Sequence, residues 1–238
     1  MDAVLYALPA SHPCAAVERA LGLKGVGCRR IELIPGPHRI VQKAVFGATT
    51  VPAVRLSDGT KVVGSRPIMR ELDARVPEPI LVPDSAVAAR AEEWGDQVLQ
   101  SLVRRVVWAA LVRAPERVMS YTEGARLPVP RPVARLSAPL IARLAATLND
   151  ASDPNVRADL RALPHHLDRI DGWIEDGSLA EDAIAARLQV GSGLRLLMTV
   201  EDVRPLIDAR PAGRMARAVF PVYAGSVGAG VLPSGWLP

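Results

Sequence analysis

A hydroxyl and a thiol lie three residues apart at the point where a helix is predicted to begin. Ser11, His12, Pro13 and Cys14 follow a short apolar run, and the pattern from Pro13 onward is amphipathic. A helix N-terminus carries partial positive charge and free N–H groups, so it stabilises an anion bound there. A serine hydroxyl at this position can donate a hydrogen bond to a bound thiolate and lower the pKa of that thiol. On spacing alone we favour a plain helix cap as the role of Ser11, with stabilisation of a bound thiolate as the alternative.

The same turn lacks the first cysteine of a Cys-x-x-Cys pair, because Ser11 stands in its place. This argues against dithiol redox chemistry, which needs both thiols. We expect Cys14 to be a small buried residue, with a reactive thiol as the alternative. We expect His12 to be an exposed loop residue, with a proton acceptor or a contact to the thiol ligand as the alternative.

The elements that would hold these side chains alternate between strand and helix. Strand-like runs cover residues 3–6, 28–33, 53–56 and 61–63, and helical patterns cover residues 13–21, 39–46 and 66–75. The last two strands are joined by Asp58-Gly59, which is a strong hairpin signal. Ser65 can cap the helix that follows, with Pro67 in its first turn. This order predicts an α/β domain with a mixed four-stranded sheet.

The rest of the chain is predicted to be helical. Prolines within residues 77–84 favour a linker. Beyond it, apolar residues recur at three-to-four spacing, which predicts amphipathic helices. We expect a buried helix over residues 188–198, and a capping box from Thr199 to Asp202 that opens a helix to about residue 208. We therefore place an α/β domain at 1–76, an all-helical domain at 85–210 and an extended tail at 211–238. The predicted apolar faces include Val87, Ala91, Trp94, Val98, Leu102 and Val106, then Leu136, Leu140, Leu144 and Leu148, then Leu160, Leu163, Leu167, Ile170 and Ile174.

Together these features resemble the glutathione S-transferase family. The resemblance is carried by Ser11 at a helix start, Val51-Pro52 before a strand and Gly64-Ser65 before a helix. That family joins a thioredoxin-like domain to an all-α helical bundle, and the likeness spans nearly the whole chain. It implies an enzyme that binds glutathione as cosubstrate and conjugates its thiolate to a hydrophobic electrophile. The resemblance makes Ser11 our candidate catalytic residue, because Ser11 takes the place of the catalytic serine or cysteine of that family. It also implies a homodimer and a role in detoxification.

The resemblance assigns thiol-binding roles to two further segments. Pro52 takes the place of the family's cis-proline, and the backbone of Val51 takes the place of the group that pairs with the cysteinyl part of the ligand. Ser65 and its helix N-terminus take the place of the γ-glutamyl carboxylate site, with Arg66 as a further carboxylate contact. Gly64 replaces the acidic residue that usually precedes this serine, which leaves mycothiol or another thiol open as the cosubstrate.

Other positions carry less specific assignments. Residues of the second predicted helix stand where the family contacts the glycine carboxylate of the ligand. The first long helix of the helical domain and the segment after it stand where the family forms its electrophile pocket, although Trp108 is also a candidate for the core. The first group is His38, Arg39, Gln42 and Lys43, and the second is Arg104, Arg105, Trp108 and Tyr121.

Two other functions stay open on the sequence. One is a thiol-dependent reductase or deglutathionylase that uses Cys14 in a mixed disulfide. The other is a non-catalytic ligand-binding or interaction module, which the absence of an acidic residue at Gly64 supports. Conjugation needs Ser11, the reductase needs Cys14, and a non-catalytic module needs neither residue.

Composition excludes several classes of partner. The net charge of +4 is spread along the chain, and nucleic-acid binders instead show a basic patch, so no nucleic acid is expected. No apolar run approaches the roughly 20 residues of a membrane span, and no signal peptide is evident. Two cysteines suit a reducing compartment, so we expect a cytoplasmic protein. His165 and His166 are adjacent on a predicted helix and point apart, so no metal is expected.

Overall fold

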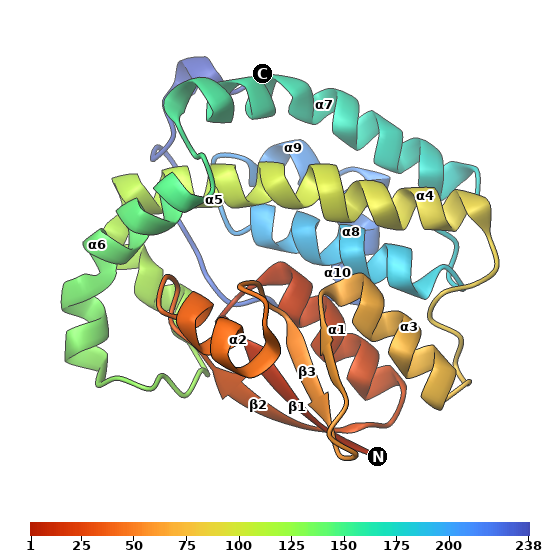
Figure 1. Cartoon of the computed structure of the whole chain (residues 1–238). Coiled ribbons are helices and arrows are strands. Elements are labelled where there is room, and N and C mark those ends of the chain that lie inside the picture. The colour runs from red at the N-terminus through yellow and green to blue at the C-terminus, as the bar shows by residue number, and fades with distance from the viewer.

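The computed structural model describes all 238 residues, with a sheet in its N-terminal part and helices in the remainder (Figure 1). The N-terminal part contains a four-stranded sheet in the order β2-β1-β3-β4, in which β1 and β2 are parallel and the other neighbouring pairs are antiparallel. The mixed four-stranded sheet that the sequence predicts is therefore confirmed. Its elements are β1 (Asp2–Ala7), α1 (His12–Leu23), β2 (Gly27–Glu32), α2 (His38–Phe46), β3 (Ala53–Leu56), β4 (Lys61–Val63) and α3 (Ser65–Arg75).

The β3–β4 hairpin forms as its sequence predicts. Gly59 has a φ of 90°, which a residue with a side chain rarely adopts, and the Asp58 carboxylate accepts the N–H of Thr60 at 2.9 Å. The hairpin carries the chain directly into α3. The start of β3 pairs with the end of β1, and the end of β4 pairs with the start of β3. The segments before β3 and after β4 therefore lie at the same end of the sheet as the turn that precedes α1.

The remainder of the chain is helical. Its first two helices are joined by a π-helical segment, η1 (Gly95–Leu99), so that residues 86–113 form one continuous rod along the molecule (Figure 1). No helix combines the length and the hydropathy that a membrane span requires. The helices are α4 (Ala86–Trp94), α5 (Gln100–Arg113), the 3₁₀ segment η2 (Pro115–Thr122), α6 (Arg131–Leu148), α7 (Asp153–Glu175), α8 (Ile184–Leu197), α9 (Arg204–Asp208), α10 (Pro211–Val219) and the short η3 (Ser234–Trp236).

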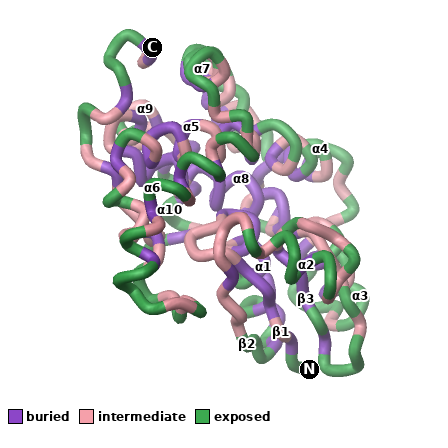
Figure 2. Tube along the Cα trace, turned by 60° about the vertical axis from the view of Figure 1, so that its left-hand side comes forward, coloured by how far each residue is buried: buried purple, intermediate pink, exposed green.

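Helix α8 joins the two cores. Figure 2 shows it buried at the centre of the helical part, as its apolar sequence predicts. Its first turn contributes Ala185 and Leu188 to the core beneath the sheet, while Val190 and Leu194 belong to the helical core. The two parts are thus packed against each other through one shared buried helix.

The predicted apolar face of α6 is on the wrong side. Leu136 and Leu140 are 86% and 71% exposed, and the helix instead packs through alanines such as Ala138 and Ala142. Small side chains let α6 approach α5 closely. The alanines and the leucines recur at the same helical spacing, so the period alone does not show which face is buried. One leucine of α6 does pack against the N-terminal part. Leu144 lies so close to Gly36 that a Cβ atom added to this glycine would be 3.1 Å from the Leu144 Cδ2 atom.

The C-terminal segment also differs from its prediction as extended coil. Residues 211–219 form α10, and the chain beyond returns to the core, where Val227, Leu232 and Trp236 are buried. The predicted capping box is wrong as well. Thr199 lies buried and bonds within the core, and Asp202 instead accepts the backbone N–H groups of residues 230, 231 and 232. Asp202 thereby holds the tail and does not support a helix start.

Candidate functional site

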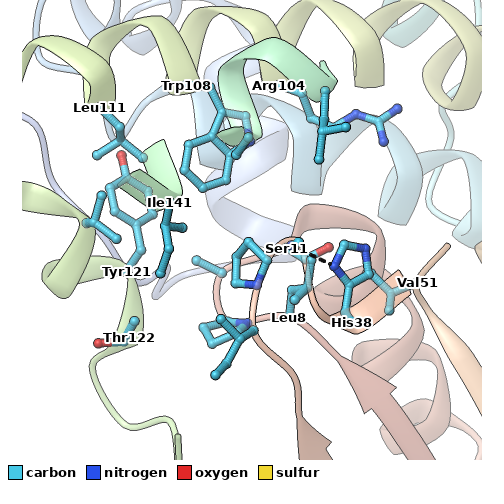
Figure 3. Close-up of a pocket in the computed structure, with 18 of the residues that line it drawn as sticks. Leu8, Ser11, His38, Val51, Arg104, Trp108, Leu111, Tyr121, Thr122 and Ile141 are labelled. Atoms are coloured by element: carbon cyan, nitrogen blue, oxygen red, sulfur yellow. Dashed lines mark hydrogen bonds between the residues drawn. The ribbon is translucent and has the colours of Figure 1, made fainter. Parts of the chain in front are cut away.

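A cavity of about 360 Å³ lies between the two parts of the molecule. The N-terminal part contributes the turn before α1, the segment before α2 and the segment before β3. The helical part contributes α5, η2 and the inner side of α6 (Figure 3). Most of the lining is apolar, so the polar groups that do face the cavity define what it can bind.

Ser11 lies in this cavity at the N-cap position of α1. Its φ and ψ of −67° and 118° are typical of an N-cap, yet its hydroxyl makes no capping hydrogen bond. The turn that presents it is tight: the Ser11 N–H bonds to the Leu8 carbonyl at 3.2 Å, and Ala10 has a φ of 52°. The hydroxyl is therefore free to bond a ligand at the positive end of a twelve-residue helix.

His12 is not the exposed loop residue that we expected. It is 2% exposed, because it begins α1 and not the loop, and its side chain turns into the cavity wall. Burial, together with the charge of Arg104, holds the pKa of His12 well below its usual range. The ring is therefore neutral at neutral pH, and its Nε2 atom has no partner within the protein.

Cys14 is fully buried, as the sequence predicts. It packs under the sheet with Leu5 and Val17 and does not line the cavity. Burial raises the pKa of the Cys14 thiol, and the nearby Ser11 side chain only partly offsets this effect. The thiol is protonated at neutral pH and does not reach the cavity.

The Val51–Pro52 peptide bond is cis, as the resemblance implies. Pro52 is buried and its carbonyl accepts the N–H of Gly64 at 2.9 Å, which ties it to the start of α3. Val51 lines the cavity, and its own N–H and C=O groups have no partner in the chain. A free donor and a free acceptor thus lie next to each other on the wall that carries Ser11, which is an arrangement that can pair with a peptide backbone.

Ser65 and Arg66 begin α3 but do not line the cavity. Ser65 is buried, and Arg66 lies 3.6 Å from the carboxylate of Glu92, which also binds Arg70 through two hydrogen bonds. Gly64 precedes them with a φ of 94°. Because a side chain rarely adopts this conformation, the backbone itself explains why glycine stands where an acidic residue was expected.

The segment before α2 brings His38 and Arg39 to the cavity. His38 Nδ1 accepts the Gly36 N–H at 3.1 Å, and partial burial lowers the pKa of its ring. Arg39 is exposed at the rim. Gln42 and Lys43, the other two candidates on this helix, do not line the cavity, and Gln42 is fully buried.

Three of the four candidates in the helical part face the cavity. Arg104 and Trp108 are four residues apart on one side of α5, and Tyr121 comes from η2 (Figure 3). The hydroxyl of Tyr121 bonds Thr199 at 2.6 Å, and burial raises its pKa to about 12. The fourth candidate, Arg105, points away from the cavity and pairs with Asp159.

Sequence reasoning missed two parts of the site. One is the wall that α6 contributes through Ala134, Ser137 and Ile141. The other is Tyr223, whose hydroxyl donates to the carbonyl of Ala10 at 3.1 Å and supports the turn that carries Ser11. No local pattern indicates either feature, because both depend on contacts between segments far apart in the chain.

Comparison with known proteins points to one family. Residues 5–80 match the family described as the glutathione S-transferase N-terminal domain. No curated protein sequence matches the chain. Among solved structures, the chain is similar to a glutathione S-transferase of Ceriporiopsis subvermispora, solved in complex with glutathione (17% identity, 93% of this chain and 99% of that one, TM-score 0.60). It is also similar to glutathione S-transferases of Rhodospirillum rubrum F11 (17%, 98% and 97%, 0.58) and Sinorhizobium meliloti 1021 (20%, 99% and 98%, 0.55).

Proposed function

We propose that the protein binds a low-molecular-weight thiol and stabilises its thiolate at Ser11, because residues 5–80 match the glutathione S-transferase N-terminal domain and the whole chain is similar in fold to members of that family. The thiolate then adds to a hydrophobic electrophile held against α5 and α6. The observation that carries this proposal is the free Ser11 hydroxyl at the start of α1, beside the unpaired backbone groups of Val51.

Each part of the site binds a different group of the thiol ligand in our proposal. Ser11 and the N-terminus of α1 stabilise negative charge on sulfur, because a donor and a helix terminus both favour the ionised form of the thiol. Val51 pairs with the backbone of the cysteinyl residue. Arg39 and His38 at the rim bind one carboxylate. The other carboxylate extends in our proposal beyond the cavity lining to the N-terminus of α3, where Ser65 binds it. Arg66 contributes little to this site in our proposal, because its guanidinium faces Glu92.

Glutathione is the thiol that we propose, with mycothiol as the alternative. The glutathione S-transferase of Ceriporiopsis subvermispora was solved in complex with glutathione, which supports this choice by likeness of fold. The protein is proposed to act in the cytoplasm as a homodimer. Both cysteines are free thiols, which suits a reducing compartment.

Calorimetric titration with glutathione and, separately, with mycothiol tests the thiol site. Saturable binding of one thiol at millimolar concentration or below is expected, weakened by Ser65→Ala. Absence of binding by both thiols would overturn the proposal and leave a non-catalytic module. Light scattering on the same samples measures the mass and would contradict the homodimer if it gave the 25.4 kDa of one chain.

Conjugation to 1-chloro-2,4-dinitrobenzene then tests the role of Ser11. Removing one charge-assisted hydrogen bond is expected to lower kcat at pH 7 by about 10- to 100-fold in Ser11→Ala and to move the pH–rate profile to higher pH. Cys14→Ala is expected to keep the wild-type profile. The reverse pattern, in which Cys14→Ala is inactive and Ser11→Ala is active, would contradict the role of Ser11 and favour the reductase alternative.

A further inference from the structure

The charged side chains that line the cavity are all positive. Among the residues that line it, Arg39 and Arg104 are charged, and no aspartate or glutamate is present. Arg39 lies at the rim beside the proposed thiol site. Arg104 lies on α5, among the apolar residues where the electrophile is proposed to bind. The thiol ligand, as proposed, does not place an anionic group beside Arg104.

Arg104 has no anionic partner within the protein. Its Nε atom donates to the Gln100 carbonyl at 3.2 Å, and its terminal nitrogens make no hydrogen bond. The adjacent Arg105 behaves differently, because it binds both carboxylate oxygens of Asp159 at 2.6 and 2.8 Å. Asp96, the nearest acidic influence on Arg104, is already bonded by the side-chain amides of Gln100 and Gln189.

An unpaired guanidinium at this depth is unfavourable. Arg104 is half-buried, and burial lowers its pKa, which means that its surroundings disfavour the charge. Charged groups withdrawn from water are normally paired or hydrogen-bonded. A bound anion would supply that pairing, and the planar guanidinium presents two parallel donors that suit a carboxylate.

The neighbours of Arg104 favour the same kind of ligand. The buried His12 Nε2 atom has no partner, and Arg104 is close enough to depress the pKa of that ring. Figure 3 shows Arg104 and Trp108 extending from α5 above the turn that holds Ser11. A flat ligand could therefore pack on Trp108 and place an anionic group at Arg104 while its reactive carbon faces Ser11.

We propose that Arg104 binds a carboxylate of the second substrate, so that the electrophile of this site is an apolar, flat molecule that carries an acidic group. The inference rests on the proposed function for the reaction, but the binding of the carboxylate does not require that reaction. Arg104 is then the residue that determines specificity among electrophiles, and Arg39 serves the thiol.

Binding of two unreactive probes tests this directly. 3-Nitrobenzoate carries the carboxylate and methyl 3-nitrobenzoate does not, and each is titrated against the full chain by calorimetry or by quenching of tryptophan fluorescence. Wild-type protein is expected to bind the acid at least about tenfold more tightly than the ester, as a charge-assisted hydrogen bond predicts. Arg104→Met is expected to remove that preference while the affinity for the ester changes by less than about twofold.

Two matched variants separate this effect from overall charge and from folding. Arg135 is exposed on α6 and does not line the cavity, so Arg135→Met removes one positive charge and should leave both affinities unchanged. Arg104→Lys keeps the charge without the planar donor pair and should give an intermediate preference. Equal affinities for acid and ester in wild-type protein, or an undiminished preference in Arg104→Met, would overturn the proposal.

The failure of this inference is distinct from the failure of the proposed function. 4-Chloro-3-nitrobenzoate reacts with a thiolate by forming a carbon–sulfur bond as chloride leaves with the carbon–chlorine electron pair. If thiol binding is saturable but Arg104→Met leaves the kcat/KM ratio of this acid to its methyl ester unchanged, the carboxylate site is wrong and the thiol site stands. If carboxylate binding depends on Arg104 but no conjugation occurs, the site is confirmed and the transferase proposal fails.

Discussion

The hydroxyl of Tyr223 donates a hydrogen bond to the carbonyl oxygen of Ala10 at 3.1 Å, across 213 positions of sequence. Ala10 has a φ of 52°, a left-handed conformation that is unfavourable for any residue with a Cβ atom. The C-terminal segment therefore supports the strained turn that presents Ser11. The turn and the tail are parts of one site, although they lie near opposite ends of the chain.

Tyr223→Phe removes this bond and keeps the ring. We expect the free energy of unfolding to fall by about 1 kcal/mol, because the Ala10 carbonyl loses its partner. We also expect weaker thiol binding, since the Ser11 turn is held less firmly. Urea denaturation and calorimetric titration measure the two effects. Tyr6→Phe is the matched control, because the Tyr6 hydroxyl makes no hydrogen bond; an equal loss of stability in both variants would contradict the role of Tyr223.

Gly225 carries a second constraint on the same segment. It has a φ of 103°, and a Cβ atom there would lie 2.3 Å from the Tyr121 ring. That ring cannot move aside easily, because its hydroxyl is bonded to Thr199 in the core. We expect Gly225→Ala to destabilise the protein by about 3 kcal/mol, from backbone strain and overpacking together.

Urea denaturation measures that loss, and Gly228→Ala provides its control. A Cβ atom on Gly228 meets nothing within 4 Å. Gly228→Ala should therefore change the free energy of unfolding by less than about 0.5 kcal/mol. Similar values for the two variants would show that the tail does not pack on Tyr121 as described.

Much of the N-terminal part follows from its sequence, because the signals there are local. Asp58-Gly59 marks the hairpin, Val51-Pro52 precedes β3 and Ser65 begins α3, and each of these depends on residues a few positions away. The four-stranded mixed sheet follows from their order. Ser11 is placed correctly at a helix start for the same reason.

The errors share a different cause, which is that the deciding contacts are distant. The leucines of α6 have the correct period for a buried face, but the alanines of the same helix have it too, and close packing on α5 selects the smaller side chains. The Gly- and Pro-rich tail lacks a helical pattern, yet Asp202 and the helical core hold it in place. His12 has the sequence context of a loop residue, but it begins α1 and is buried where Arg104 of α5 comes close enough to lower its pKa.

The two cysteines should react very differently with alkylating reagents. Cys28 is exposed and Cys14 is fully buried. We expect iodoacetamide to label Cys28 in the native protein and Cys14 only after unfolding, as measured by mass spectrometry of the digested chain. Burial raises the pKa of both thiols, so labelling of Cys28 should still accelerate above about pH 8.5. Rapid native labelling of Cys14 at pH 7 would favour the reductase alternative.

The buried His12 should make stability depend on pH in one direction. Because its pKa is lower in the folded state than in the unfolded chain, the unfolded chain takes up the proton first as pH falls. The stability is therefore fully present above about pH 7.5 and is lost as pH falls through the unfolded value of about 6.5, with a limiting slope of about 1.4 kcal/mol per pH unit. Partial burial also lowers the pKa of His38 and His166, so these two add to the same trend.

Urea denaturation between pH 7.5 and 5.5 measures the contribution of His12. His12→Gln cannot be protonated, so the free energy of unfolding of this variant should fall less steeply with pH than that of the wild-type protein. A slope that is the same in wild type and His12→Gln would mean that His12 is accessible to protons in the folded protein. That result would remove the reason to treat its unpartnered nitrogen as part of a closed site beside Arg104.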